Sequence, residues 1–398
     1  MRARVAFAAA MILAGVSVAA CAGILGFDRL EAAAGPDATT PEASTPDVGV
    51  DAGPDPCDLL VLPQPPENGS GGQSEFWFAT STVDFGLEAD AGIPDGGGLT
   101  EQTGFNLDRK CTVSAETSSC RLLPNADFAS YQNDKTSTGV DNAGYKLLQS
   151  LSGLGSDRPF APSNINARMR AGRFNLVFRV SGYNNTPNDR DVLVNYFPSS
   201  RGLLVQDAGP PKFDDTDTFL LDDTRGPGGF DGLSIYQDKT AYVTNGTIVA
   251  HFDRIPFTLD VSDDQERLTI WLSDVVIVGT LSTRDGGAPT LDRAVAAGRW
   301  SAEDFLREVG KLVTAGSAVC QQPDIFNLLV KSTFCPALDL RNKAAEDNKN
   351  LPCDALSAVL VLRGYNVKEQ SKYQKFDAGS GPCANADLTC PSGDAGAD

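Results

Sequence analysis

The stretch AYVTNGTIVAHF, residues 241–252, carries the strongest secondary-structure signal in the chain. Asn245-Gly246 separates two runs that are rich in β-branched and aromatic residues. Both central residues of a type I′ turn need a positive φ, which Asn and Gly adopt at low cost. The stretch therefore predicts a β-hairpin with a two-residue turn.

Similar short runs lie on both sides of this hairpin. They are Ser74–Phe85, Phe174–Tyr183, Val192–Phe197, Ile255–Val261, Arg267–Ser273, Val275–Leu281 and Ser357–Leu362. Several short strands with turn signals about every 8–12 residues are typical of a sandwich or a barrel. We expect a mainly β fold, an antiparallel β-sandwich with a jelly-roll-like topology.

One segment departs from the strand pattern. Ser301 precedes two acidic residues, and apolar residues from Phe305 to Val313 recur at helical spacing. A second helix is expected around residues 324–332. We therefore predict a small helical insertion, at about residues 301–335, before the last strand.

Trp271 lies in an apolar run, so we expect it in the core.

The N-terminus resembles a bacterial export signal. Arg2 and Arg4 precede an apolar run that ends in VAAC at residues 18–21. This ending resembles a lipobox, which predicts a signal peptide over residues 1–20 and a lipid-modified Cys21 carrying acyl chains such as palmitate. The next residue is Ala22 and not Asp, which favours the outer membrane. We expect a protein of the bacterial cell envelope, held to the membrane by its lipid anchor.

The composition divides the rest of the chain into three parts. Residues 21–56 hold five prolines and few large apolar side chains, so they predict a disordered tether after the anchor cysteine. Residues 57–369 carry the strand pattern and the helical insertion, and they form the predicted domain. Residues 370–398 are polar and are expected to form a flexible C-terminal tail.

The chain has nine cysteines, and eight remain if Cys21 carries lipid. An even number of thiols in an oxidising compartment predicts disulfides, here up to four, although buried free thiols are an alternative. Closeness in sequence favours the pairs Cys111–Cys120, Cys320–Cys335 and Cys383–Cys390. The eight disulfide candidates are Cys57, Cys111, Cys120, Cys320, Cys335, Cys353, Cys383 and Cys390.

The charge and the motifs exclude several function classes. A formal net charge of −19 argues against nucleic acid as a partner. His251 is the single histidine, so no two-histidine metal site can form, and we expect it to be an ordinary strand residue. The chain has no G-x-S-x-G, S-x-x-K, P-loop or C-x-x-C pattern. No catalytic residue is therefore predicted.

Acidic residues are the remaining candidates for a metal site. Oxygen-rich loops suit Ca²⁺, which takes about 6–8 oxygen ligands. The spacing does not match an EF-hand loop, and a solvated acidic loop is the alternative. Apart from Ca²⁺ we expect no cofactor. The candidate ligands are Asp214, Asp215, Asp217 and Asp222.

Four stretches resemble a group of uncharacterised predicted lipoproteins that are common in myxobacteria. They are residues 104–120 (GFNLDRKCTVSAETSSC), 139–147 (GVDNAGYKL), 241–249 (AYVTNGTIV) and 353–357 (CDALS). The resemblance covers most of the predicted domain. It implies export and lipidation, and it implies no activity.

These observations favour a non-enzymatic surface protein that has a structural role or binds a glycan or another protein. The alternative is an envelope glycoside hydrolase, which needs two carboxylates facing each other across a groove. With 52 acidic residues the sequence nominates no such pair.

Overall fold

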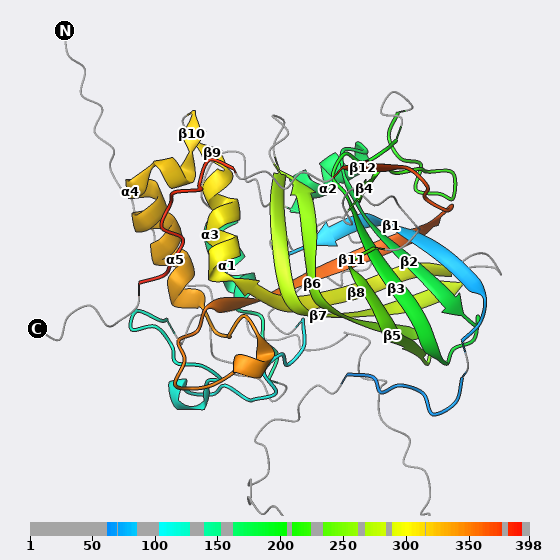
Figure 1. The fold of residues 1–398 in the computed structure, drawn as a ribbon, viewed down its shortest axis with the longest axis horizontal. Helices are drawn as coiled ribbons and strands as arrows, with labels where there is room; N and C mark the ends of the chain where they lie inside the picture. The colour runs from blue at the N-terminus through cyan, green and yellow to red at the C-terminus, as the bar shows by residue number, and fades with distance from the viewer. Residues whose placement is uncertain are drawn as a thin grey trace, which may run out of the picture. The chain divides into compact units, whose positions relative to one another are not determined.

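A computed structural model gives the fold (Figure 1). It describes residues 62–69, 71–85, 103–127, 139–152, 162–204, 209–223, 234–261, 267–283, 289–314, 316–375 and 381–391. The expected signal peptide, the lipid anchor at Cys21, the tether and Cys57 lie outside these described residues. None of the helices in the described part is long and apolar enough to span a membrane.

Eight antiparallel strands form one closed β-barrel (Figure 1). Each barrel strand pairs with the barrel strands that come before and after it along the chain, and the last strand, β11, pairs with the first, β1. The strands are β1 (Ser74–Asp84), β2 (Asn175–Tyr183), β3 (Asp189–Ser199), β5 (Gln237–Thr244), β6 (Thr247–Asp260), β7 (Arg267–Thr283), β8 (Pro289–Ser301) and β11 (Ala355–Val367).

The prediction of a mainly β, antiparallel fold is confirmed. The strands differ from the expected jelly-roll-like sandwich because they close into one sheet with an up-and-down order. The reason is that β1 pairs with β2 along one edge and with β11 along the other. A sandwich and a barrel bury the same alternating face of each strand, so the sequence pattern did not separate them.

The hairpin between β5 and β6 has the predicted turn. Thr244 pairs with Thr247, and the turn residues Asn245 and Gly246 have φ values of 50° and 78°. β6 and β7 are each longer than predicted. β6 continues through residues 253–254 and β7 through residue 274, where the sequence predicted breaks between shorter strands. In β7 this point is a bulge at Asp274, whose φ is 49°, so the chain bends there without ending the strand.

β8 was not predicted from the sequence. Its sequence PTLDRAVAAGRWS contains three Ala and one each of Pro, Asp and Gly, which are residues of low β propensity. Pairing with β7 on one side and β11 on the other holds it in the sheet. Here tertiary pairing outweighs the local preference.

Two further helices were not predicted either: α1 (Ala143–Ser152) and α2 (Pro162–Arg170). α2 packs on β1 and β6 and buries Ile165 and Met169 completely. The side chain of Asn166 accepts a hydrogen bond from the Val83 N–H at 2.8 Å and donates one to its carbonyl at 2.9 Å. α2 is therefore fastened beside the last residues of β1.

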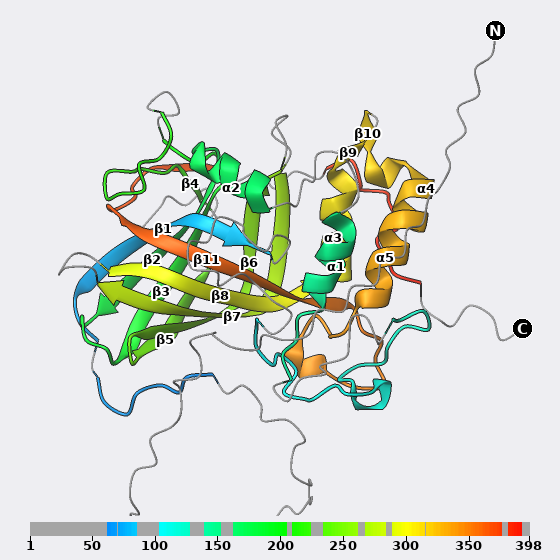
Figure 2. The same ribbon diagram turned by 180° about the vertical axis from the view of Figure 1, so that it is seen from behind.

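The helical insertion lies before the last barrel strand, as predicted (Figure 2). Ser301 caps its first helix by accepting a hydrogen bond from the Asp304 N–H, and Phe305 stacks on Phe334 with ring centroids 3.7 Å apart. The elements are α3 (Ala302–Lys311), β9 (Val313–Thr314), β10 (Ser317–Ala318), η4 (Val319–Gln321), α4 (Pro323–Ile325), η5 (Phe326–Lys331), α5 (Ser332–Phe334) and η6 (Cys335–Ala337).

Four short elements complete the described structure. β4 (Leu221–Asp223) and β12 (Tyr373–Lys375) form a parallel two-stranded sheet, and η1 (Ala115–Thr117) and η7 (Ala344–Glu346) lie in loops. β4 and β12 belong to segments that cover the outer face of β1, β2, β3 and β11, where Trp77 and Phe197 are buried.

The prediction that the cysteines form disulfides is confirmed, but the predicted pairs are wrong. The observed disulfides are Cys120–Cys353, Cys320–Cys383 and Cys335–Cys390, with sequence separations of 233, 63 and 55 residues. Cys111 is also disulfide-bonded. The pairing follows contacts between distant segments in the folded chain, which sequence spacing does not report.

Two of these disulfides join the C-terminal segment to the helical insertion. Cys383 and Cys390 both lie in residues 381–391, within the expected tail. The Lys331 ammonium adds an ion pair with Asp387 at 2.8 Å. Residues 370–375 and 381–391 are therefore part of the folded structure and not of a free tail.

Candidate functional site

The barrel interior is filled by side chains. One cavity inside the barrel holds about 20 Å³ and has only apolar walls, which include Phe78, Phe178, Ile248 and Leu291. A cavity of this size holds about one water molecule, and apolar walls give that water no partner. The inward-facing side chains of the described strands form one buried cluster, so this cavity lies in a packed core and is too small for a ligand.

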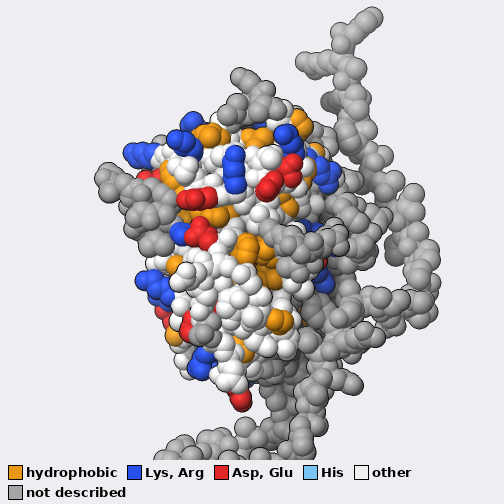
Figure 3. Space-filling model, turned by 90° about the vertical axis from the view of Figure 1, so that its right-hand side faces the viewer, with side chains coloured by type: hydrophobic (Ala, Val, Ile, Leu, Met, Phe, Trp, Pro, Cys, Tyr) orange, Lys and Arg blue, Asp and Glu red, His pale blue; other side chains and the backbone are white. Residues whose placement is uncertain are grey.

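A cleft of about 610 Å³ lies on the outside, where β1 begins and β11 ends. This volume falls within the range of about 300–1,000 Å³ that is usual for ligand sites. Figure 3 views the right-hand side of Figure 1, where basic and acidic side chains lie together among apolar ones. The cleft is lined by Glu75, Phe76, Trp77, Arg179, Asn366, Val367, Lys368 and Glu369.

One wall of the cleft carries a fixed ion pair. The Glu75 carboxylate accepts hydrogen bonds from Arg179 at 2.6 Å and from the Trp77 Nε1–H at 2.8 Å. The Arg179 guanidinium lies 5.6 Å from the Trp77 ring centroid, and Trp77 stacks on Phe197. The alternation of β1 places Glu75 and Trp77 on the same outer face, opposite Arg179 of β2.

This arrangement decides the charge of Glu75. Burial of the Glu75 carboxyl group raises its pKa, but the hydrogen bonds from Arg179 and Trp77 and the positive charge of Arg179 together lower the pKa below its ordinary value. The carboxylate is therefore ionised at neutral pH and already paired. Such a group orients and binds, whereas a proton donor at neutral pH needs a raised pKa.

The other wall follows the end of β11. Asn366 is half-buried, and Lys368 and Glu369 are exposed. The Lys368 N–H donates to the Asp215 carbonyl, so the chain leaves the barrel at this residue and no longer follows β1. Within the described residues the Lys368 ammonium has no ion-pair partner, which leaves its charge available to a ligand.

Tyr373 of β12 lies near both walls. Burial raises the pKa of its phenol, and the negative charges of Glu369 and Asp223 raise it further, while the positive charge of Arg179 lowers it. The phenol is therefore neutral at physiological pH. Its hydroxyl donates to the Gln370 carbonyl at 2.8 Å, so Tyr373 borders the site without lining the cleft.

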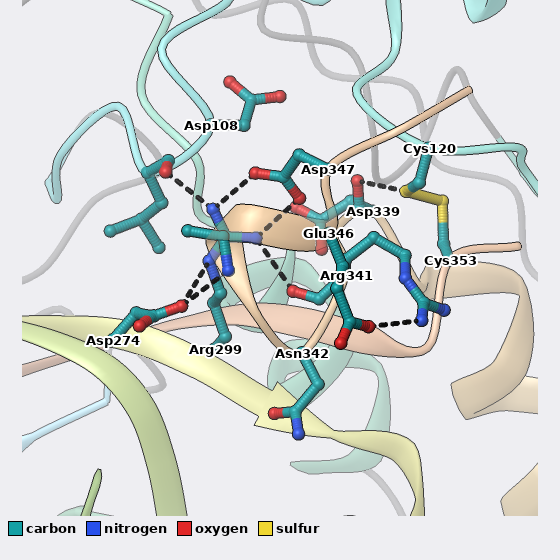
Figure 4. A network of polar contacts seen from close by, with 12 residues as sticks. Asp108, Cys120, Asp274, Arg299, Asp339, Arg341, Asn342, Glu346, Asp347 and Cys353 are labelled. Atoms are coloured by element: carbon teal, nitrogen blue, oxygen red, sulfur yellow. Dashed lines mark hydrogen bonds and ion pairs between the residues drawn. A yellow bond between two sulfur atoms is a disulfide. The ribbon is translucent and has the colours of Figure 1, made fainter. Parts of the chain in front are cut away.

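A second polar centre surrounds Arg299 of β8 (Figure 4). The Arg299 side chain has no exposed surface, and its guanidinium donates to both carboxylate oxygens of Asp347 at 2.8 Å. It also donates to the carbonyl oxygens of Arg341 and Leu107 at 2.8 and 2.7 Å. Arg299 therefore fastens two loops, residues 103–127 and 339–354, to the barrel.

Asp339 belongs to the same centre. Its carboxylate accepts hydrogen bonds from the Ser357 N–H at 2.8 Å and from the Ser357 hydroxyl at 2.6 Å. Burial of the carboxyl group raises its pKa to about 7, and the charge of Asp108 contributes in the same direction. The Cys120–Cys353 disulfide joins the two loops beside it (Figure 4). We interpret this centre as a structural clamp, because its polar groups hold one another.

The predicted calcium ligands have protein partners. Asp217 accepts from the Lys212 and Phe213 N–H groups and from the Tyr365 hydroxyl. Asp222 accepts from Ser200 and Gln374. Asp214 accepts from Thr216, and only the backbone carbonyl of Asp215 has a described contact, with Lys368.

Among the described residues, the four predicted calcium ligands do not converge on one point where an ion could bind. In the part of the chain that the structure describes, no three His, Cys, Asp or Glu side chains lie close enough to hold a metal ion. The calcium site stays a prediction from the acidic sequence.

Two other residues from the sequence lie on the outer surface of the barrel. The His251 side chain is exposed, and its backbone N–H donates to Asp238 at 2.7 Å. The expectation that Trp271 lies in the core is wrong: it is half-exposed, with the Arg254 guanidinium 4.6 Å from its ring centroid. The neighbours of Trp271 in β7, Ile270 and Leu272, face the interior instead.

The cleft residues were not predicted, because they come from three segments that are far apart in the sequence. The alternation of β1 and the charged residues after β11 were visible, but their pairing was not. Comparisons with known protein families, with curated proteins and with solved structures find no match for this chain.

Proposed function

We propose that the protein is a non-enzymatic binding protein of the bacterial envelope, anchored through a lipid on Cys21, and that its ligand binds in the outer cleft. The export signal and the lipobox support the location. The cleft supports the binding role, because its lining combines the Glu75–Arg179 ion pair with the exposed charges of Lys368 and Glu369. The filled barrel supports the surface and leaves the cleft as the site of recognition.

The observation that carries the proposal is the state of Glu75. A glycoside hydrolase needs one carboxylic acid that gives a proton to the leaving group. Glu75 is held ionised by Arg179 and Trp77, so it does not suit that role. Glu369, the other carboxylate of the cleft, is exposed to solvent, whereas a catalytic acid lies in an apolar pocket. The cleft therefore favours binding over hydrolysis.

A binding screen tests this proposal. The purified mature protein is screened against an array of soluble oligosaccharides and a displayed library of heptapeptides. We expect binders that lose affinity at least about tenfold in Lys368→Glu, because a cleft charge is reversed. Lys372→Glu is the matched control, since Lys372 is also exposed but does not line the cleft. Binders that ignore both changes would place the site elsewhere and overturn the proposal.

The hydrolase alternative has its own readout. Release of reducing ends from the same oligosaccharides is measured for the wild-type protein and for Glu369→Gln and Glu75→Gln. We expect no release above background in any of the three. Turnover by the wild type that disappears in either variant would make the protein an enzyme.

The lipid anchor is tested separately. Mass spectrometry of the mature protein should find an acylated Cys21 as the first residue. The Cys21→Ser variant should leave the membrane fraction, because the acyl chains supply the anchoring. A mature protein that begins elsewhere without lipid would remove the anchor from the proposal.

A further inference from the structure

The cleft is a gap in the barrel wall. β1 pairs with β2 from Ser74 onward, but its pairing with β11 begins only at Trp77, opposite Val367. Within the described residues, Ser74–Phe76 therefore has a strand on one side and no strand on the other. The gap coincides with the cleft, because Glu75 and Phe76 line one side and Lys368 and Glu369 line the other.

The free side of Ser74–Phe76 is a strand edge inside a cleft. Residues of an antiparallel strand direct their backbone groups alternately to one neighbour and to the other. Part of the backbone of this segment therefore faces the cleft, where no described strand pairs with it. Such an edge is a template for another extended chain.

The two faces of this edge have different chemistry. Phe76 points to the barrel side, where its ring meets Tyr183 edge-on with centroids 6.2 Å apart. Glu75 points to the outer side, where it pairs with Arg179. A strand that pairs with this edge would place alternate side chains beside an aromatic ring and beside an ion pair.

We infer that the ligand of the cleft is an extended peptide segment of another protein, which pairs with the free edge of β1 as an added strand. The segment alternates apolar and polar side chains: the apolar ones pack near Phe76, and the polar ones meet Glu75, Arg179 and Lys368. This inference rests on the proposed function and names the class of its ligand. A glycan lacks the backbone that the strand edge would pair with.

Backbone methylation of the ligand is the decisive test. A heptapeptide selected from the displayed library is resynthesised with a methyl group on one backbone nitrogen at a time. We expect an alternating pattern along the peptide, in which every second methylation weakens binding about tenfold because it removes one strand hydrogen bond. A uniform, small effect would overturn strand pairing, since side-chain binding alone does not alternate.

Two variants of the protein give an independent test. Successive N–H groups of β1 face opposite sides, so only one of Glu75→Pro and Phe76→Pro removes a donor from the cleft and spares the pairing with β2. We expect circular dichroism to find that one of the two variants folds like the wild type, and we expect this variant to bind the peptide about tenfold more weakly than the Ala variant at the same position, which loses the side chain but keeps the N–H. If the Pro variant that lacks the cleft-facing N–H folds and still binds the peptide with wild-type affinity, the inference is wrong.

The screen separates this inference from the proposed function. If only oligosaccharides bind, and Lys368→Glu weakens them, the peptide inference is wrong while the binding function stands. If neither library yields a binder that depends on Lys368, both are wrong.

Discussion

Replacing Asp339 by Asn should change how the stability of the protein depends on pH. The Asp339 pKa rises from 3.8 to about 7, because its carboxyl group is buried and lies near the charge of Asp108. In the unfolded chain the group ionises near its ordinary pKa. Between these two values the folded protein binds one proton more than the unfolded protein, so the free energy of unfolding falls as the pH rises.

The size of the effect follows from the two pKa values. Each pKa unit corresponds to about 1.4 kcal/mol, so the full loss is about 4 kcal/mol, of which about 3 kcal/mol falls between pH 5 and pH 8. The stability is fully present below pH 3.8 and is lost as the pH passes about 7. Asp339 is half-buried as a residue, so solvent relaxes part of this penalty and the figure is an upper limit.

Asn in place of Asp339 cannot ionise but keeps an oxygen that accepts from the Ser357 N–H. Urea unfolding at pH 5, 6, 7 and 8 gives the free energy of each protein. We expect the wild type to lose up to about 3 kcal/mol more than Asp339→Asn over this range.

Asp214→Asn is the matched control. Asp214 is exposed, and the hydrogen bonds from Thr216 lower its pKa, so the loss of this titration leaves the slope between pH 5 and pH 8 unchanged. Other carboxylates whose pKa is raised by burial, such as Asp260, titrate equally in all three proteins and cancel in the comparison. Equal slopes for Asp339→Asn and the wild type would refute the reasoning.

Three further predictions concern the loops and the acidic cluster. The double change Cys120→Ser and Cys353→Ser should cost about 2–5 kcal/mol in urea unfolding, because it removes a link across 233 residues; reduction of the wild type should cost more, because it also opens the other disulfides, and no loss in the double variant would contradict the assignment. Arg299→Met should cost about 3–5 kcal/mol in the same assay, because it leaves Asp347 without its charged partner, and a neutral outcome would show that the clamp is not needed. Finally, if the acidic loop at residues 214–222 binds Ca²⁺, EDTA should lower the melting temperature and added Ca²⁺ should restore it; an unchanged melting temperature would remove the site.

The resemblance of the N-terminus to a lipoprotein signal concerns residues that the structure does not describe, so it stays a prediction for mass spectrometry. The assignments that the structure does confirm are local ones. Asn245-Gly246 predicted its hairpin turn, and the alternation of Phe174–Tyr183 predicted β2, because both signals come from neighbouring residues. Ser301 likewise marked the start of α3.

The tertiary structure decided what depends on distant partners. β8 is a strand because β7 and β11 hold it, although its own residues favour other structures. Cys120 is joined to Cys353 and not to Cys111, because the barrel brings residues 103–127 beside residues 339–354. No property of a single segment reports such an approach.

The candidate site shows the same division. The sequence alone determined the mainly β class, the hairpin, the helical insertion and the presence of charged residues beside two strands. Only the closed barrel placed Glu75 next to Arg179 and left Ser74–Phe76 without a second strand neighbour among the described residues. The physical reason is that strand order and stagger are set by pairing over long separations, whereas the sequence pattern reports only which face of each strand is buried.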